Sequence, residues 1–187
     1  VHSLTDKGAG RGAIGVVMRD IVDPASGELV ARSTNVSVLR GDGGFSETDG
    51  LSDPPPPPLP AVPDRAPDRT VAAPTRPEAA LLYRLTGDMN PIHSDPAVAR
   101  AAGFPRPILH GLCTYAMACH AILRQLADHD PSRLTDLALR FTAPVLPGDT
   151  VDFEFWREDD ARWRLRGRVA ARGVTVVDNG VVGLKEG

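Results

Sequence analysis

Five consecutive prolines, Pro54 to Pro58, constrain the fold of this chain more than any other feature of its sequence. Proline has a fixed φ and no backbone N–H, so such a run favours an extended polyproline II conformation and cannot enter the interior of a sheet. We therefore interpret residues 46–66 as a semi-rigid linker between residues 1–45 and a larger domain, residues 67–187.

Residues 1–45 have the pattern of a β-hairpin. Gly12 to Asp23 and Glu28 to Arg40 are rich in residues that favour strands, and Pro24 to Gly27 between them is typical of a turn. An isolated hairpin is only marginally stable in water, so we expect these two strands to pair with further structure.

The larger domain combines helices with strands, which predicts an α+β fold. The longest expected helix, Gly111 to Ala127, is apolar on several faces, as expected of a helix that a sheet surrounds. Short helices are expected at Pro77 to Leu85 and at Ala97 to Ala102. Alternating or β-branched stretches predict the strands, at Arg69 to Pro74, Leu134 to Pro144, Thr150 to Arg157, Trp163 to Arg172 and Val174 to Leu184.

The segment Gly-Asp-Met-Asn-Pro-Ile-His, residues 87–93, places three polar side chains on a stiff turn. Its glycine and proline restrict the backbone, so Asp88, Asn90 and His93 point in defined directions. A carboxylate and an imidazole held a turn apart can share a water and move a proton in either direction. Asn90 can hold either group without changing the charge balance. By themselves, Asp88 and Asn90 would also be explained as turn formers.

The whole string from Tyr83 to His93, Tyr-x-Leu-Thr-Gly-Asp-x-Asn-Pro-Ile-His, resembles the signature of the MaoC-like, R-specific enoyl-CoA hydratase family. The resemblance is continuous over this string and extends loosely over residues 67–187. It implies the hotdog fold, in which a curved antiparallel sheet wraps a long central helix. It also implies reversible hydration of a trans-2-enoyl thioester, such as an enoyl-CoA, to an R-3-hydroxyacyl thioester.

The resemblance also implies roles for individual residues. Asp88 and His93 match the catalytic pair, which binds the attacking water and delivers a proton to C2, and Asn90 matches a supporting position. Gly111 matches the glycine whose backbone N–H faces the thioester carbonyl. The first turn of a helix has free N–H groups and a partial positive charge, which stabilise negative charge on such an oxygen. We interpret His110 as a loop residue beside the pocket.

Family members with two hotdog units suggest an interpretation of the hairpin. Residues 1–45 resemble the later strands of a first unit, so we expect a double hotdog whose first unit is incomplete in this chain. The alternative is a shortened protein whose hairpin joins the remaining sheet. Because hotdog domains commonly pair through their sheets, we expect a homodimer of chains or a pseudo-dimer of two units.

Composition and charge argue against several classes of partner. The hydrophobic fraction of 42% and the charged fraction of 24% are those of an ordinary globular protein. A net charge of −3 gives no reason to expect nucleic acid, and the sequence predicts no membrane span. Without an evident secretory leader, and with Cys113 and Cys119 on different sides of the expected helix, we expect a cytoplasmic protein with free thiols. The expected chemistry needs no metal or other cofactor.

Three other functions fit parts of the sequence. A 3-hydroxyacyl-ACP dehydratase would use the same residues with another carrier, for which Arg100 and Arg106 are candidate contacts. A hotdog acyl-CoA thioesterase often uses a carboxylate on the long helix, and Gly111 to Ala127 contains neither Asp nor Glu. The third alternative is a non-catalytic subunit that binds acyl thioesters. The intact string from Tyr83 to His93 favours catalysis.

Overall fold

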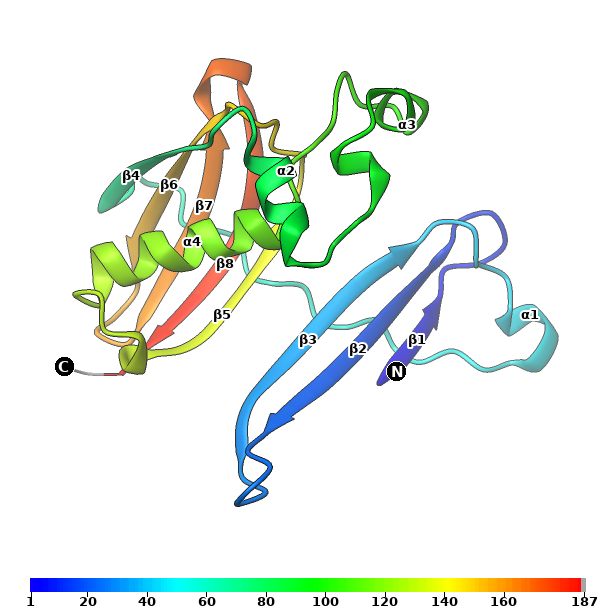
Figure 1. The fold of residues 1–187 in the computed structure, drawn as a ribbon. Coiled ribbons are helices and arrows are strands. Elements are labelled where there is room, and N and C mark those ends of the chain that lie inside the picture. Colours follow the sequence, from blue (N-terminus) through cyan, green and yellow to red (C-terminus); the bar gives the residue numbers. More distant parts are fainter. Residues whose placement is uncertain (186–187) are drawn as a thin grey trace. The chain divides into compact units, whose positions relative to one another are not determined.

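The computed structural model describes residues 1–185, in two compact units that divide after Pro58. The last two residues of the expected domain 67–187 lie outside the described residues. Each unit has its own antiparallel sheet (Figure 1). No helix within residues 1–185 is both long enough and apolar enough to cross a membrane.

The first unit is a three-stranded sheet in the order β1-β2-β3, followed by a short helix. The elements are β1 (Ser3–Asp6), β2 (Ala13–Val22), β3 (Leu29–Leu39) and α1 (Ser46–Asp49). Strands β2 and β3 confirm the predicted hairpin. The sequence analysis missed β1 and α1, because four residues are too few to show a periodicity.

The carboxylate of Asp6 fastens the end of β1 to the segment after the hairpin. Its two oxygens accept hydrogen bonds from the backbone N–H groups of Gly8, Gly44 and Ser46, and from the Ser46 hydroxyl. These donors hold the pKa of Asp6 well below its usual range, the bond from Gly44 having the largest effect. Asp6 is therefore one of the polar residues that tie β1 to the segment after the hairpin, together with Ser52 and Asp53.

The second unit is a curved five-stranded sheet in the order β4-β6-β7-β8-β5, with helix α4 packed along one face (Figure 1). All neighbouring strands are antiparallel. This arrangement confirms the expected α+β hotdog fold. That residues 1–45 belong to a first, incomplete hotdog unit remains a prediction. The elements are β4 (Arg69–Pro74), α2 (Ala79–Tyr83), α3 (Pro96–Ala101), α4 (Gly111–Leu126), β5 (Leu134–Phe141), β6 (Thr150–Arg157), β7 (Arg162–Val169) and β8 (Val174–Leu184), with short 3-10 helices at Arg84–Thr86, Pro91–His93, Pro131–Arg133 and Ala170–Arg172.

The core lies between α4 and the concave face of the sheet. Every second residue of β6 faces inward, and the same alternation holds for most of β7. Helix α4 contributes one stripe, Thr114, Ala118, Ile122 and Leu126, spaced by four residues. The helix is apolar on several faces, as predicted, but not all of these faces are buried, because Leu112 is 62% exposed and Ala116 is also exposed. The sheet within this chain covers one side of the helix only.

Part of the expected linker 46–66 is attached to the second sheet. The indole N–H of Trp156 donates to the carbonyl of Arg65, and the Asn179 side chain donates to the carbonyl of Leu59. Trp156 lies on the face of β6 opposite to the core residues Phe155 and Val151, and it is nevertheless fully buried. Residues 59–66 therefore lie within the second unit, and their carbonyl groups satisfy side chains of its sheet.

Candidate active site

The turn at residues 87–93 forms as its glycine and proline suggest. Gly87 has a φ of 115° and ends the 3-10 helix Arg84–Thr86, a conformation that favours glycine. The backbone N–H of Asn90 donates to the Asp88 carboxylate, and the Asn90 side chain accepts from the N–H of Ile92. Asn90 thus caps the short helix that carries His93. Its contact with the expected catalytic pair runs through the backbone.

His93 is held inside the protein by one hydrogen bond. The side chain is 8% exposed, and its Nδ1 lies 2.8 Å from the carbonyl oxygen of Ile108. A carbonyl oxygen only accepts, so Nδ1 carries the proton and Nε2 has a free lone pair in the neutral ring. The atom that can act as a base is therefore Nε2.

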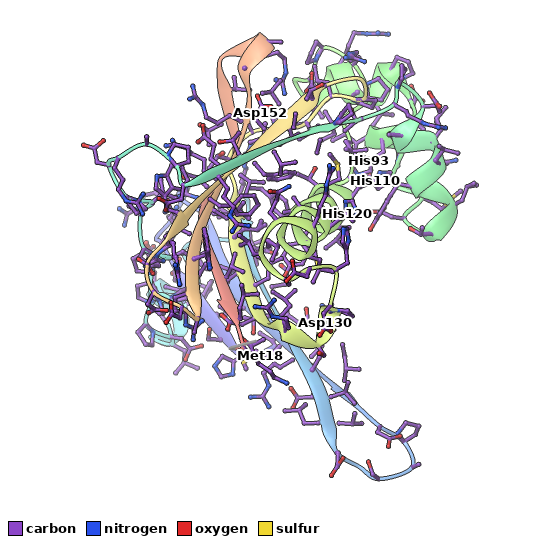
Figure 2. All side chains as sticks on the ribbon, turned by 90° about the vertical axis from the view of Figure 1, so that its left-hand side faces the viewer. Met18, His93, His110, His120, Asp130 and Asp152 are labelled. Atoms are coloured by element: carbon purple, nitrogen blue, oxygen red, sulfur yellow. The ribbon has the colours of Figure 1, made fainter. Side chains whose placement is uncertain are left out.

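His110, which we had interpreted as a loop residue beside the pocket, lies at the centre of the site. It is the residue before helix α4, is 1% exposed, and stacks on His93 with ring centroids 3.7 Å apart and an interplanar angle of 23°. Its Nε2 lies 3.2 Å from the Asp88 carbonyl oxygen, and the Tyr83 ring packs beside it. Figure 2 shows both histidines together near α4. The sequence placed His110 at a helix start but could not show this stacking.

Asp88, His93 and His110 form one cluster. A carboxylate oxygen and one nitrogen from each ring all lie within 4.8 Å of one another, with Asp88 exposed and both rings buried. A water at hydrogen-bond lengths of about 2.8 Å can contact two atoms at that separation. The structure therefore brings the two residues expected to be catalytic within reach of one water.

The same three residue types also occur in metal centres, so the geometry of the rings matters. Each imidazole here uses one nitrogen for a backbone carbonyl. Ring lone pairs lie in the ring plane, and these two stacked rings have centroids 3.7 Å apart with an interplanar angle of 23°, so their lone pairs point in nearly parallel planes and do not converge on a point about 2.1 Å from both nitrogens. We therefore assign no metal to the cluster. That the chemistry needs no metal stays a prediction.

Burial of the site affects the charge state of His110. Desolvation lowers its pKa most, and the nearby charges of His93 and Arg84 lower it further, while the Asp88 carbonyl and carboxylate act in the opposite direction. Its Nδ1 is buried and has no hydrogen-bond partner within residues 1–185. Both observations favour a neutral His110 ring with its proton on Nε2.

Gly111 is the first residue of α4, next to this cluster in the chain. The helix has no side-chain cap at its N-terminus, so the N–H groups of its first turn are left without that partner. A Cβ added at Gly111 would lie 3.5 Å from the ring of Phe141, an ordinary contact distance. The glycine is therefore not required by crowding.

Other candidate residues have structural explanations. Arg106 donates to the carbonyl of Pro147, so its guanidinium is partly engaged. Cys113 and Cys119 are free and half-buried, as expected, and burial raises the pKa of both thiols. Thiols with a raised pKa are poor nucleophiles, which leaves them as packing residues.

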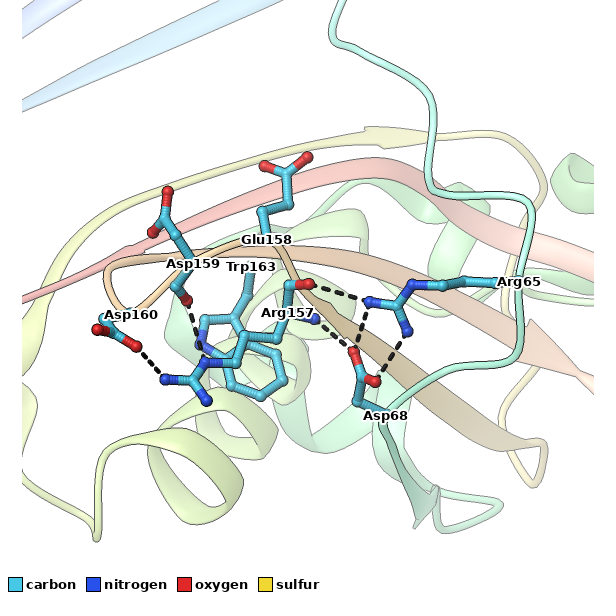
Figure 3. A pocket seen from close by; sticks show the side chains of 7 residues that line it. All are labelled: Arg65, Asp68, Arg157, Glu158, Asp159, Asp160 and Trp163. Carbon is cyan, nitrogen blue, oxygen red and sulfur yellow. Dashed lines mark hydrogen bonds and ion pairs between the residues drawn. The ribbon is translucent and has the colours of Figure 1, made fainter.

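Away from the Asp88 cluster, the surface of this unit has a depression among charged side chains. It is an open depression bordered by Arg65, Asp68, Trp163 and residues 157–160. Figure 3 shows its ion pairs, with the Arg65 guanidinium on Asp68 and the Arg157 guanidinium on Asp160. Because both of its arginines are paired with carboxylates and none of its residues belongs to the Asp88 cluster, it does not compete as the reaction site.

Comparisons with known proteins agree with this fold. The family model described as "MaoC like domain" matches residues 59–179. The chain is 45% identical over 187 residues to 3-hydroxyacyl-thioester dehydratase Y of Mycobacterium tuberculosis, covering 97% of this chain and 63% of that protein. It is 50% identical over 119 residues to enoyl-CoA hydratase ChsH3 of the same organism, covering 64% of this chain and 40% of that protein.

A solved structure extends the likeness to three dimensions. The MaoC-like dehydratase from Phytophthora capsici matches with a TM-score of 0.88 at 31% identity, covering 99% of this chain and 62% of that one. The chain thus spans less than two thirds of the length of each of these three proteins. The match of the family model to most of the second unit establishes that this chain belongs to the MaoC-like dehydratase family.

Proposed function

We propose that the chain catalyses the reversible hydration of trans-2-enoyl thioesters to R-3-hydroxyacyl thioesters. The observation that carries this proposal is the Asp88–His93–His110 cluster at the start of α4, where an acid–base pair lies next to a helix N-terminus that no side chain caps. The relatives named as an enoyl-CoA hydratase and a 3-hydroxyacyl-thioester dehydratase support the two directions of one reaction. The R configuration is expected from the signature string.

In the proposed reaction these residues bind a water and transfer two protons. Asp88, ionised, and the neutral Nε2 of His93 hold a water between them. As the water oxygen bonds to C3, the electron pair of the C2–C3 double bond moves toward C2 and the thioester carbonyl. The pair takes one proton from the water and delivers one to C2, so both groups regain their starting charge. Dehydration follows the same steps in reverse.

The N-terminus of α4 supports the carbonyl end of the substrate in this proposal. Negative charge grows on the thioester oxygen during addition, and the N–H of Gly111 can donate to that oxygen. A preorganised donor of this kind is typically worth about 3 kcal/mol, and the helix dipole adds to it. The thioester carbonyl would then bind at Gly111, and the water at Asp88 and His93, which the residue before Gly111, His110, contacts.

The finer assignments rest on the same family resemblance. We propose acyl-CoA rather than acyl-ACP as the carrier, and a homodimer or pseudo-dimer of hotdog units as the assembly. A cytoplasmic location remains a prediction, and the relatives include proteins named as peroxisomal. Among the alternatives, the dehydratase acting on acyl-ACP differs only in the carrier, so direct competition between the two substrates distinguishes them.

Loss of the enoyl-thioester absorbance of crotonyl-CoA tests the proposal. The Asp88→Asn variant removes the carboxylate that holds the water, and turnover should fall by about 10²–10⁴-fold. Asp95→Asn is the matched control, because Asp95 caps α3 on the same segment and asparagine caps almost as well. An R-specific dehydrogenase then reports the configuration of the product.

Two results would contradict the assignment. Asp88→Asn with the turnover of the parent would remove Asp88 from the mechanism. A folded parent that hydrates neither crotonyl-CoA nor a longer trans-2-enoyl-CoA would point to another carrier or to a binding role, and release of free thiol would then test for thioester hydrolysis.

A further inference from the structure

His110 joins three parts of the site that are separate in the sequence. Its Nε2 reaches the backbone carbonyl of Asp88, its ring stacks on His93, and its main chain leads directly into Gly111. A change at His110 would therefore move several elements of the site together.

The hydrogen-bond pattern of His110 fixes its tautomer. The Asp88 carbonyl oxygen accepts, so Nε2 carries a proton, and the buried Nδ1 has no acceptor within the described chain. Protonation of Nδ1 would place an unpaired N–H in a buried position beside the His93 ring and the Arg84 guanidinium. The groups that face His110 are these two, the Asp88 turn and the Tyr83 ring.

We propose that His110 is a positioning residue, whose neutral ring holds the Asp88 turn and the His93 ring in register with the first turn of α4. This inference rests on the proposed function, because it is the water between Asp88 and His93 that needs this register. His110 itself takes no proton during the reaction. Its ring is a rigid spacer: the donor at one edge fixes the turn, and its face fixes the plane of His93.

Two variants test the two contacts of His110 separately, the hydrogen bond from Nε2–H and the stacking of its ring. In His110→Gln the side-chain amide can still donate to the Asp88 carbonyl, but the stacked ring is gone. In His110→Phe a ring remains, but the donor is lost. Each variant should lower kcat by about five- to tenfold with a smaller change in KM, because each keeps one of two contacts.

His110→Ala loses both contacts and should lower kcat by about 10²-fold, the scale expected when reacting groups are misplaced. His120→Gln is the matched control, since His120 is exposed on the same helix and should leave kcat unchanged. If the alanine variant does not fold, the Gln and Phe variants still decide the question. Values of kcat within twofold of the parent in both would overturn the proposal.

A measurement without substrate separates this inference from the proposed activity. In protein labelled with ¹⁵N-histidine, the signal lost in His110→Gln identifies His110, and its ring nitrogens should show the Nε2–H tautomer of a neutral ring. A His110 that carries its proton on Nδ1 would overturn the positioning role, whatever the enzyme assay shows. Unchanged activity in Asp88→Asn would instead overturn the proposed function, and with it the need for this register, even where the tautomer is the expected one.

Discussion

The two units of this chain both consist of antiparallel strands, but only the second has a second layer. In β6 the inward residues Val151, Phe153 and Phe155 are fully buried, because α4 covers that face of the sheet. In β3 nearly every residue is exposed, and Val36 is 55% exposed. A sequence pattern typical of strands therefore specifies the extended backbone, whereas the burial of its side chains depends on what packs against that face of the sheet.

The units also differ in what holds them together. The hydrophobic core cluster lies wholly in the second unit, while the first relies on hydrogen bonds around Asp6 and on two buried apolar side chains, Ala13 and Val16. Hydrophobic burial is the larger stabilising effect, at about 25 cal/mol for each Å² of apolar surface removed from water. We therefore expect the second unit to be the more stable one.

A matched pair of substitutions gives the largest expected difference. Val151→Ala removes two methyl groups from a fully buried position in β6 and should lower the free energy of unfolding by about 2–3 kcal/mol. Val36→Ala makes the same change at an exposed position in β3 and should cost about 0.5 kcal/mol or less. Urea unfolding followed by the fluorescence of Trp156 and Trp163 reports the second unit, and hydrogen exchange reports both.

The outcome of this pair bears directly on the first unit. An equal loss of stability in the two variants would show that β3 is covered in solution, and the comparison of the two sheets would then fail. Fast hydrogen exchange across β3, with strong protection in β6 and β7, is the expected result.

Two glycines with the same steric clearance give the next largest effect. A Cβ added at Gly111 or at Gly15 would lie 3.5 Å from one side chain, Phe141 or Leu39 respectively. Both alanine variants should fold, but Gly111→Ala places a methyl group beside the proposed oxyanion N–H and should lower kcat on the order of tenfold. Gly15→Ala, in the first unit, should keep the kcat of the parent. An unchanged kcat in Gly111→Ala would remove the glycine from the site.

The smallest expected effect is the change in stability when acid protonates Asp68 in the second unit and Asp6 in the first. The Arg65 guanidinium and the backbone N–H of Arg157 lower the pKa of Asp68 to about 2, from an ordinary value of 3.8. Because the folded-state pKa is depressed, Asp68 contributes stability above pH 4 and loses that contribution as the pH falls toward 2. Asp6 should act in the same direction in the first unit.

Unfolding midpoints measured between pH 5 and pH 2 check this prediction. The difference between the parent and Asp68→Asn should shrink as the pH falls, in the fluorescence of the second unit. For Asp6→Asn the same trend should appear in hydrogen exchange of residues 1–58. A difference that stays constant with pH would mean that the carboxylate charge does not matter in that unit.

Local features of the fold were predictable from the sequence. The bounds of β4, β6 and β8 are those predicted, and α4 ends one residue earlier than expected. Apart from β1 and α1, which were missed, the differences are mainly at element ends. Strand β7 stops at Val169 and continues as a 3-10 turn, and the helix expected at Pro77 to Leu85 is shorter and becomes a 3-10 helix. Such ends depend on hydrogen bonds that tertiary contacts decide.

The candidate site was predictable in part. Asp88, Asn90 and His93 were chosen from the signature string, and Gly111 from the family resemblance at the start of the helix. The structure places Asp88, His93 and the helix start together, with Asn90 capping the turn. Their catalytic roles remain proposals. His110 was underestimated, because its burial, its stacking on His93 and its bond to Asp88 involve residues 17 to 22 positions away, and nothing in its local sequence shows them.

The sequence by itself determined the strands, the turns at glycine and proline and the residues of the signature, because these depend on backbone preferences and on neighbours a few positions apart. Only the tertiary structure decided which strands pack on a hydrophobic core and which side of α4 is buried. It also decided that the rings of His93 and His110 stack on one another in a buried position. Those properties come from contacts between segments that are distant in the sequence. The free energy of such a contact depends on which apolar surface it removes from water and on whether the buried polar groups find hydrogen-bond partners.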